Sequence, residues 1–382
     1  MKTIKIVSKI GLEKSYFPKK PFAFLNHQKK MPLDKFNRKL TDVRISLIDK
    51  CNFRCTYCMP KTVFDDNYQF LGNKDLLTFE EVVFISSAFI KLGAEKLRLT
   101  GGEPLLRKNV EDLVKILASL RTIERKPVEI ALTTNGTLLF GKAQSLFDAG
   151  LQRITVSLDS LNQEIFEAIS DTNFSVKEIL KGIDHAKKIG LEVKVNMVVR
   201  KGLNENQIIP MAKYFKNRGV TLRFIEFMDV GSSNSWKKEK VATSQEILTL
   251  LKKEFVLNYI GRENANEVSE KWQYDCDETQ IGLISSVTNP FCKNCTRARI
   301  SADGFLYTCL FASNGFDLKS ILRSTINNSE KSNLDQKNRI IELLAQHISE
   351  IWHHRADRYS ELRSLNPETS KKRKIEMSYI GG

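Results

Sequence analysis

Short runs of β-branched and apolar residues recur through the first two-thirds of the chain, and longer segments with helical spacing separate them. Each run has the length and composition of a β-strand. We therefore predict six strands, over residues 43–48, 96–100, 128–133, 154–158, 192–199 and 221–225.

Apolar residues three and four positions apart predict amphipathic helices between these strands, over residues 78–92, 110–120, 138–149, 176–189 and 207–216. The first helix opens on a capping box, Thr78-Phe-Glu-Glu81, and Gly93 lies where its C-cap would be. Strands in alternation with helices indicate a parallel α/β fold. Six units are too few to close an eight-fold barrel, so we expect an incomplete (β/α)6 barrel with reactive residues at the C-terminal ends of its strands.

Length and cysteine content narrow the class of protein. A chain of 382 residues can bury a substantial core and suits one large domain plus a smaller one. No apolar run approaches the roughly 18 residues of a membrane-spanning helix, so we expect no membrane partner. Seven cysteines in two tight groups and one stray position do not resemble a secreted disulfide framework. These thiols are better explained as metal ligands.

The formal net charge is +15, and most of this excess lies in residues 1–40, which hold eleven Lys and Arg against Glu13 and Asp34. A basic groove with interleaved aromatic residues is not evident, so we expect no nucleic-acid partner. We expect residues 1–31 to be a basic, disordered extension of a cytoplasmic protein. Alternatively, residues 1–28 form a presequence for the mitochondrial matrix, although they lack the usual arginine.

Three cysteines with the spacing C-x3-C-x2-C, Cys51, Cys55 and Cys58, follow the first predicted strand. A cubane cluster has four irons, so three protein thiolates leave one iron open for a small molecule. A structural zinc site would need a fourth ligand, and the next hundred residues contain no histidine or cysteine. The triplet therefore favours a [4Fe-4S] cluster with one open iron.

Together with Thr100-Gly-Gly-Glu-Pro104 after the second strand, this triplet resembles the signature of the radical S-adenosylmethionine (SAM) enzymes. The resemblance implies that the open iron chelates SAM and that Gly102 lies in the segment receiving its amino group. It also implies that Ser157 contacts the SAM carboxylate and that Tyr57 and Met228 frame the adenine. Without this context, a lone Tyr or Met would be a packing residue and a glycine pair a tight turn.

A second triplet consists of Cys292, Cys295 and Cys309. A zinc site remains open as an alternative here, because Cys276 could complete four ligands. Arg297 and Arg299 lie two residues apart, so they point to the same side of an extended strand and can bind phosphate groups bidentately. Beside an open-iron cluster, such a pair indicates a clamp for an anionic substrate.

The pattern Cys-x2-Cys-Thr-Arg-Ala-Arg, with a cysteine thirteen residues on and a terminal Ser378-Tyr-Ile-Gly-Gly382, resembles the MoaA family over residues 32–382. This family comprises the GTP 3′,8-cyclases of molybdenum cofactor biosynthesis, which are radical SAM lyases. The resemblance implies a partial barrel over residues 32–230 and a closing C-terminal region over residues 231–382. That region would hold a second [4Fe-4S] cluster and the Gly-Gly tail.

The activity implied by the resemblance begins with reductive cleavage of SAM at the first cluster. The resulting 5′-deoxyadenosyl radical abstracts the ribose 3′ hydrogen of GTP, and the sugar radical attacks guanine C8. The second cluster would hold guanine at its open iron and so fix the distance between the reacting centres. The family match places GTP contacts at Arg44, Arg98, Thr133, Lys194, Arg297 and Arg299, with possible phosphate or tail contacts at Arg223, Gly381 and Gly382. A one-residue slip would exchange Thr133 for Thr134.

The partners implied are GTP, an external electron donor, a downstream cyclic pyranopterin monophosphate synthase and a second copy of the chain in a homodimer. Two other functions remain open. A two-cluster radical SAM peptide maturase would have more C-terminal cysteines and no Arg-x-Arg pair. A non-catalytic iron-sulfur or zinc protein that binds nucleic acid would bind metal without cleaving SAM.

Overall fold

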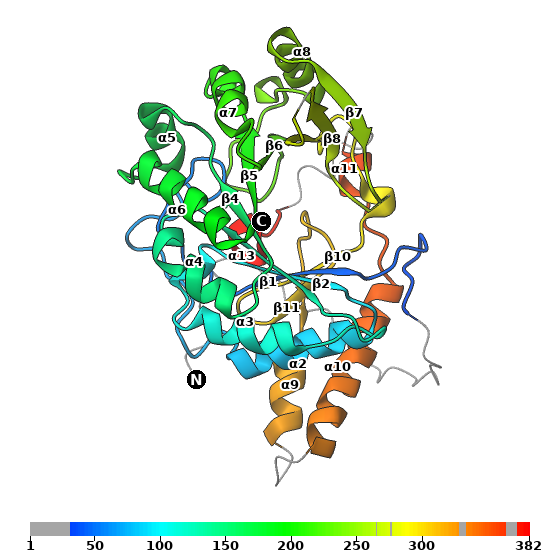
Figure 1. Cartoon of the computed structure of the whole chain (residues 1–382). Helices are drawn as coiled ribbons and strands as arrows, with labels where there is room; N and C mark the ends of the chain where they lie inside the picture. Colours follow the sequence, from blue (N-terminus) through cyan, green and yellow to red (C-terminus); the bar gives the residue numbers. More distant parts are fainter. Residues whose placement is uncertain (1–30, 265, 276, 328–333, 364–372) are drawn as a thin grey trace.

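The computed structural model describes residues 31–264, 266–275, 277–327, 334–363 and 373–382 (Figure 1). The N-terminal extension through residue 30 and Cys276 lie outside the described residues, so the predictions made for them remain predictions. Within the described ranges, no helix is long and apolar enough to cross a bilayer.

The six predicted strands form, with ends within two residues of the expected ones. They are β1 (Asp42–Ser46), β2 (Lys96–Thr100), β3 (Glu129–Thr134), β4 (Arg153–Ser157), β5 (Glu192–Val199) and β6 (Thr221–Glu226). Each pairs in parallel with the next one along the chain. The expectation of a parallel, incomplete barrel is therefore confirmed.

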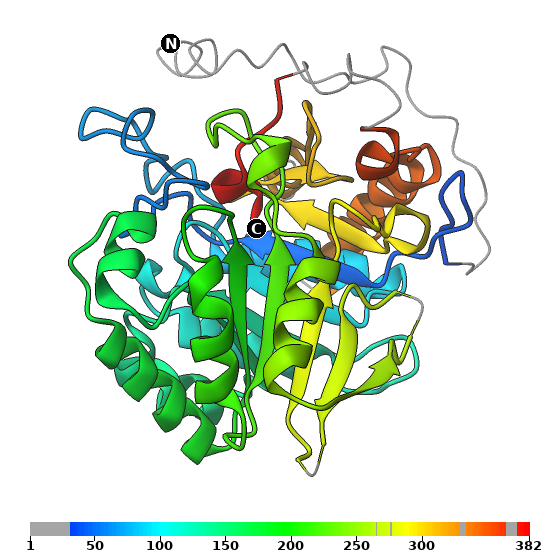
Figure 2. The same cartoon turned by 90° about the horizontal axis from the view of Figure 1, so that it is seen from above.

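The five predicted helices also form and lie along the outer side of the curved sheet (Figures 1 and 2). They are α2 (Phe79–Lys91), α3 (Val110–Ser119), α4 (Leu139–Asp148), α6 (Val176–Ile189) and α7 (Ile208–Phe215). The capping box of α2 is complete, since Thr78 accepts from the Glu81 N–H and Glu81 accepts from the Thr78 N–H. A short sixth helix, α5 (Gln163–Ser170), was not predicted.

The C-terminal region extends the sheet at both edges. Strand β9 (Gln280–Ile284) pairs in parallel with β6, and β10 (Arg297–Ile300) pairs in parallel with β1. The remaining strands are antiparallel additions, β7 (Leu257–Gly261) and β8 (Glu270–Tyr274) beyond β9, and β11 (Phe305–Tyr307) and β12 (Phe316–Asp317) beyond β10. The C-terminal helices are α8 (Ser244–Glu254), α9 (Leu318–Asn327), α10 (Leu334–His353), α11 (Tyr359–Leu362) and α13 (Met377–Ile380). Strand β10, which follows Cys292 and Cys295, thereby lies beside β1, and β1 leads into the first cysteine triplet.

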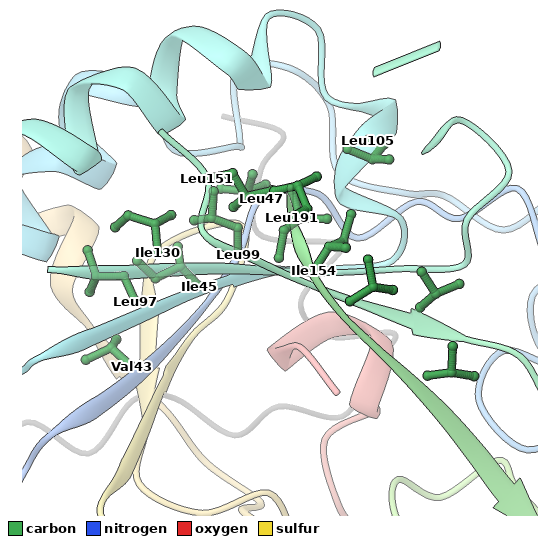
Figure 3. Packing of buried hydrophobic residues seen from close by; sticks show 14 of the residues in the cluster. Val43, Ile45, Leu47, Leu97, Leu99, Leu105, Ile130, Leu151, Ile154 and Leu191 are labelled. Carbon is green, nitrogen blue, oxygen red and sulfur yellow. The ribbon is translucent and has the colours of Figure 1, made fainter. Parts of the chain in front are cut away.

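Successive side chains of a strand face opposite sides of the sheet, and here the two sides differ in chemistry. Figure 3 shows Val43 and Ile45 of β1 packed with Leu97 and Leu99 of β2, and all four are at most 1% exposed. The alternate positions carry charged and hydroxyl side chains. Because the helices cover the apolar face, the polar residues line the inside of the barrel, and this arrangement creates the site.

Candidate active site

The inside of the barrel encloses a cavity of about 1080 Å³. Both cysteine triplets line it, as do all the other residues predicted for the site except Gly381. The two triplets come from opposite ends of the sequence and meet because β10 pairs with β1. Two candidate cluster sites therefore share one chamber.

The first triplet lies on the loop that follows β1. The N–H groups of Cys58 and Met59 both donate to the Cys55 carbonyl, at 3.0 and 2.9 Å, which closes a tight turn. The Arg54 guanidinium donates to the carbonyls of Cys51 and Phe53 at 2.8 and 2.9 Å. The loop backbone is therefore fixed before any metal is bound.

The thiols of this loop are partly buried, and burial disfavours their charged form. Burial raises the pKa of Cys51 to about 11, and it raises the pKa of Cys55 and of Cys58 as well. A coordinating metal reverses this preference, because it binds the thiolate. The donor set, three partly buried thiols lining a cavity, thus fits a cationic iron cluster.

The glycine pair is needed for close packing of the chain against itself. A Cβ on Gly102 would lie 2.3 Å from the Lys50 carbonyl oxygen, and one on Gly101 would lie 2.4 Å from that of Ile48. Gly102 N–H donates to Ile48 O at 2.7 Å. The pair therefore sets the position of the cysteine loop against the end of β2.

Gly102→Ala is accordingly expected to displace the cysteine loop, because its Cβ would clash with backbone atoms, Lys50 O at 2.3 Å and Asp49 O at 2.8 Å. We expect the unfolding free energy to fall by roughly 1–3 kcal/mol and the iron bound by the first triplet after anaerobic reconstitution to fall with it. Gly141→Ala in α4 is the matched control, since its Cβ would meet nothing within 4 Å. Equal iron content in the two variants would contradict this assignment.

Glu103 of the same motif connects the ends of β2 and β3. Its carboxylate accepts from the Thr134 hydroxyl at 2.7 Å and from the Asn135 N–H at 2.8 Å. Burial nevertheless raises the pKa of Glu103 to about 7. Thr134 is thus directed at Glu103, whereas its neighbour Thr133 accepts from Arg98 Nη1 at 3.2 Å.

The predicted SAM contacts line the cavity together with the first triplet. Tyr57 donates its hydroxyl to Asp159 Oδ2 at 2.7 Å, and the Val198 N–H donates to the other oxygen at 2.7 Å. Burial raises the pKa of Asp159 to about 6, although both hydrogen bonds oppose the shift. Ser157 and Met228 line the cavity from the ends of β4 and β6. All four predicted SAM contacts, Tyr57, Gly102, Ser157 and Met228, therefore line the same cavity as the first triplet.

The second triplet is built from a short 3-10 turn over Cys292–Asn294 and from the segment after β11. Burial would raise the pKa of Cys295, but the positive charges of Arg297 and Arg355 outweigh it and lower the value to about 7. Burial raises the pKa of Cys309 to about 12. The zinc alternative for this triplet depends on Cys276, which lies outside the described residues, so it stays a prediction.

Three arginines stand side by side across the cavity wall. Arg44 is in register with Arg98 on one side and with Arg299 on the other. Burial and the neighbouring guanidiniums lower the pKa of Arg44 well below its usual value. Among the residues that the structure describes, the Nε atoms of Arg44 and Arg98 and Nη2 of Arg297 are buried and have no hydrogen-bond partner. Crowded cations with unused donors fit an anion bound between them.

Further cations line the cavity beside this row, since Arg98 and Arg223 both donate to the Thr155 hydroxyl. Arg223 donates from Nε to Asn196 Oδ1 at 2.9 Å, and burial lowers its pKa to about 9. Lys194 pairs with Glu192 at 3.0 Å. Sequence reasoning missed Arg153, which bridges Glu129 and Glu192 inside the barrel. The alternation of polar and apolar residues along β4 is the signal that could have found it.

The C-terminal tail ends inside the barrel mouth (Figure 2). Arg299 donates to the Gly381 carbonyl, and Gly382 lines the cavity. Gly381 has a φ of +75°, and a Cβ there would lie 2.2 Å from Thr100 Cγ2, so the position requires glycine. Lys374 anchors the base of the tail through Asp229 Oδ2 at 2.8 Å. The tail therefore contacts one of the predicted clamp residues directly.

Two families of known proteins match the chain in sequence. The model of the Radical SAM superfamily matches residues 45–215, and that of Molybdenum Cofactor Synthesis C matches residues 220–361. GTP 3′,8-cyclases of Staphylococcus epidermidis and Staphylococcus haemolyticus are each 45% identical over 351 residues, which cover 91% of this chain and 98% of the relative. The solved structure of Streptococcus suis SuiB bound to S-adenosylmethionine has a similar fold, with a TM-score of 0.55 and 12% identity over 82% of this chain and 69% of that one.

Proposed function

The chain belongs to the GTP 3′,8-cyclase family of radical SAM enzymes, and from this premise we propose that its cavity holds SAM and GTP between two open-iron clusters. The protein uses a [4Fe-4S] cluster and SAM to cyclise GTP in molybdenum cofactor synthesis. The observation that most supports the arrangement is that both cysteine triplets and the arginine row line the same cavity.

Cys51, Cys55 and Cys58 would hold the cluster that binds SAM, since their loop is preformed and offers three thiols. When bound there, the cluster and SAM would supply the one-electron chemistry of the reaction, which the protein side chains themselves cannot provide. Gly102 sets the loop, Ser157 offers a hydroxyl for the SAM carboxylate, and Tyr57 is oriented by Asp159. Met228 offers an apolar side chain to the adenine.

Cys292, Cys295 and Cys309 would hold a second [4Fe-4S] cluster with guanine at its open iron. The chemistry of the donor set supports this, because three thiols again face the cavity. Two fixed ends, the guanine and the triphosphate, would leave the ribose little freedom to move. Such positioning is worth several orders of magnitude in rate.

The triphosphate would bind the arginine row and the neighbouring cations of the cavity lining. Arg44, Arg98, Arg297 and Arg299 supply fork-shaped donors, Lys194 and Arg223 supply charge, and Thr133 orients Arg98. The Gly381–Gly382 tail would share Arg299 with the nucleotide. In this arrangement residues 32–230 form the SAM-binding partial barrel, residues 231–382 hold the second cluster and the Gly-Gly tail, and both parts contribute contacts to GTP.

Anaerobic reconstitution with iron and sulfide, followed by addition of reductant, SAM and GTP, tests the proposal. We expect 5′-deoxyadenosine to form together with loss of GTP. Deoxyadenosine that forms at the same rate without GTP would indicate another radical SAM substrate, such as a peptide. Absence of deoxyadenosine under reducing conditions would contradict the assignment as a whole.

Arg297→Lys is expected to weaken GTP binding while leaving SAM binding intact. Lysine keeps the charge but loses the planar fork, so the KM for GTP should rise roughly tenfold to a hundredfold. Arg323→Lys is the matched control, because Arg323 pairs with Glu81 between α9 and α2, at residues that do not line the cavity. An unchanged KM for GTP in the Arg297 variant would remove Arg297 from the clamp.

Family membership also supports a set of partners. We propose an external one-electron donor, a homodimer, a cytoplasmic location, and delivery of the cyclised nucleotide to a cyclic pyranopterin monophosphate synthase. Sedimentation equilibrium of the reconstituted protein tests the dimer, and a monomer at micromolar concentration would contradict it.

A further inference from the structure

Three buried residues outside the cavity lining hold the second cysteine triplet from behind. They are Asp34, Arg38 and Arg355, whose side chains are at most 2% exposed. Asp34 and Arg38 lie in the turn before β1, and Arg355 follows α10. The three come together from the two ends of the described chain.

The Asp34 carboxylate organises this group. Its Oδ1 accepts from the N–H groups of Phe36 and Arg38, both at 2.9 Å. Its Oδ2 accepts from Arg38 Nε at 2.5 Å and from Arg355 Nη1 at 3.2 Å. Both guanidiniums are therefore fixed by one carboxylate that is itself fully hydrogen-bonded.

The two guanidiniums then bind the backbone of the triplet. Arg38 Nη1 donates to the Cys292 carbonyl at 2.7 Å. Arg355 Nη1 donates to the Cys295 carbonyl at 2.7 Å, and its Nε donates to the carbonyl of Thr308, next to Cys309, at 3.0 Å. Cys292 and Cys295 thus each accept a hydrogen bond from a buried arginine at their own carbonyl, and for Cys309 the acceptor is the carbonyl of the residue before it. Asp357, 3.6 Å from Arg355 Nε, accepts from the Thr308 hydroxyl and is the other carboxylate facing the group.

We propose that Asp34, Arg38 and Arg355 form a positioning unit that orients Cys292, Cys295 and Cys309 toward one cluster. This inference rests on the proposed second cluster. Residues behind metal ligands commonly control metal retention, and their loss costs roughly tenfold to a hundredfold in affinity. Because the unit joins both ends of the chain, it also couples folding of the C-terminal region to assembly of the second site.

The test isolates each triplet in the full-length chain. In a background with Cys51, Cys55 and Cys58 all replaced by Ala, the reconstituted protein should bind about four irons on the second triplet. Arg355→Gln in that background should release iron to a chelator roughly ten to a hundred times faster. Arg355→Lys should restore part of the retention, and the control Arg323→Gln should change nothing. Arg38→Gln, which removes only the contacts of Arg38, should accelerate iron release in the same direction.

The reciprocal background separates positioning from general destabilisation. With Cys292, Cys295 and Cys309 replaced instead, Arg355→Gln should leave iron retention by the first triplet unchanged. Faster loss from both backgrounds would mean a general structural role and would overturn the inference, as would unchanged release in the first background. If the first background binds no iron even with Arg355 intact, the proposed second cluster fails and the inference fails with it, whereas the first cluster is unaffected.

Discussion

Replacing Cys295 by serine is expected to reduce formation of the cyclised nucleotide by roughly three orders of magnitude, while SAM cleavage continues. Cys295 is far from the Cys51–Cys58 loop in sequence, but it lines the same cavity. In the proposed arrangement, the second cluster would lose a ligand without this thiolate, and guanine would lose the open iron proposed to hold it. The ribose is then no longer held in place for reaction, and loss of such positioning can lower the rate by roughly three orders of magnitude.

The measurement is a parallel count of 5′-deoxyadenosine and cyclised product under identical reducing conditions. Cys276→Ser is the matched control, since Cys276 belongs to neither triplet, and it should behave as wild type. If Cys276→Ser lost the iron of the second triplet, Cys276 would be a fourth ligand and the open-iron arrangement would be wrong. Undiminished cyclisation in the Cys295 variant would contradict the role proposed for the second triplet.

Replacing Cys55 by serine is expected to abolish both products, by roughly three orders of magnitude or more, because the cofactor supplies the chemistry. Cys55 is the central thiol of its loop, and its carbonyl already accepts two backbone N–H groups. The serine variant should therefore fold normally and still bind iron at the second triplet. Half the iron of wild type, with no 5′-deoxyadenosine, is the expected result, measured by iron analysis and by chromatography. Residual SAM cleavage near the wild-type rate would contradict the assignment of the first triplet.

Most of the barrel could be predicted from local sequence. Strands β2 and β5 begin and end where the apolar runs do, and the capping box at Thr78 marks the start of α2. These features depend on residues close together in the chain, so their pattern is visible in one dimension. Helix α5 was missed because its eight residues give only two turns of apolar spacing.

The added strands could not be predicted in the same way. That β9 and β10 join opposite edges of the sheet depends on pairing across most of the chain, which no local pattern records. Likewise, the reason for Gly102 lies in the Lys50 carbonyl about fifty positions earlier. Sequence patterns located this glycine, and only the packing explains it.

The candidate site likewise contains residues that local sequence identifies and residues that it does not. The cysteine spacing and the Arg-x-Arg pair are local patterns and were identified from the sequence. Asp34, Arg38 and Arg355 carry no motif, and each would pass for an ordinary surface charge in sequence. Their significance lies in burial and in the carbonyl groups they bind, which are set by the three-dimensional structure alone.

Transfer of the ribose 3′ hydrogen tests most directly whether the cavity brings SAM and GTP together. GTP carrying deuterium at the 3′ position would be incubated anaerobically with the reconstituted protein, SAM and reductant, and the 5′-deoxyadenosine analysed by mass spectrometry. The account predicts deoxyadenosine that is one deuterium heavier, formed in step with the cyclised nucleotide. Unlabelled deoxyadenosine accompanying cyclised product would mean that the radical takes its hydrogen elsewhere, and it would contradict the shared chamber as the place of reaction.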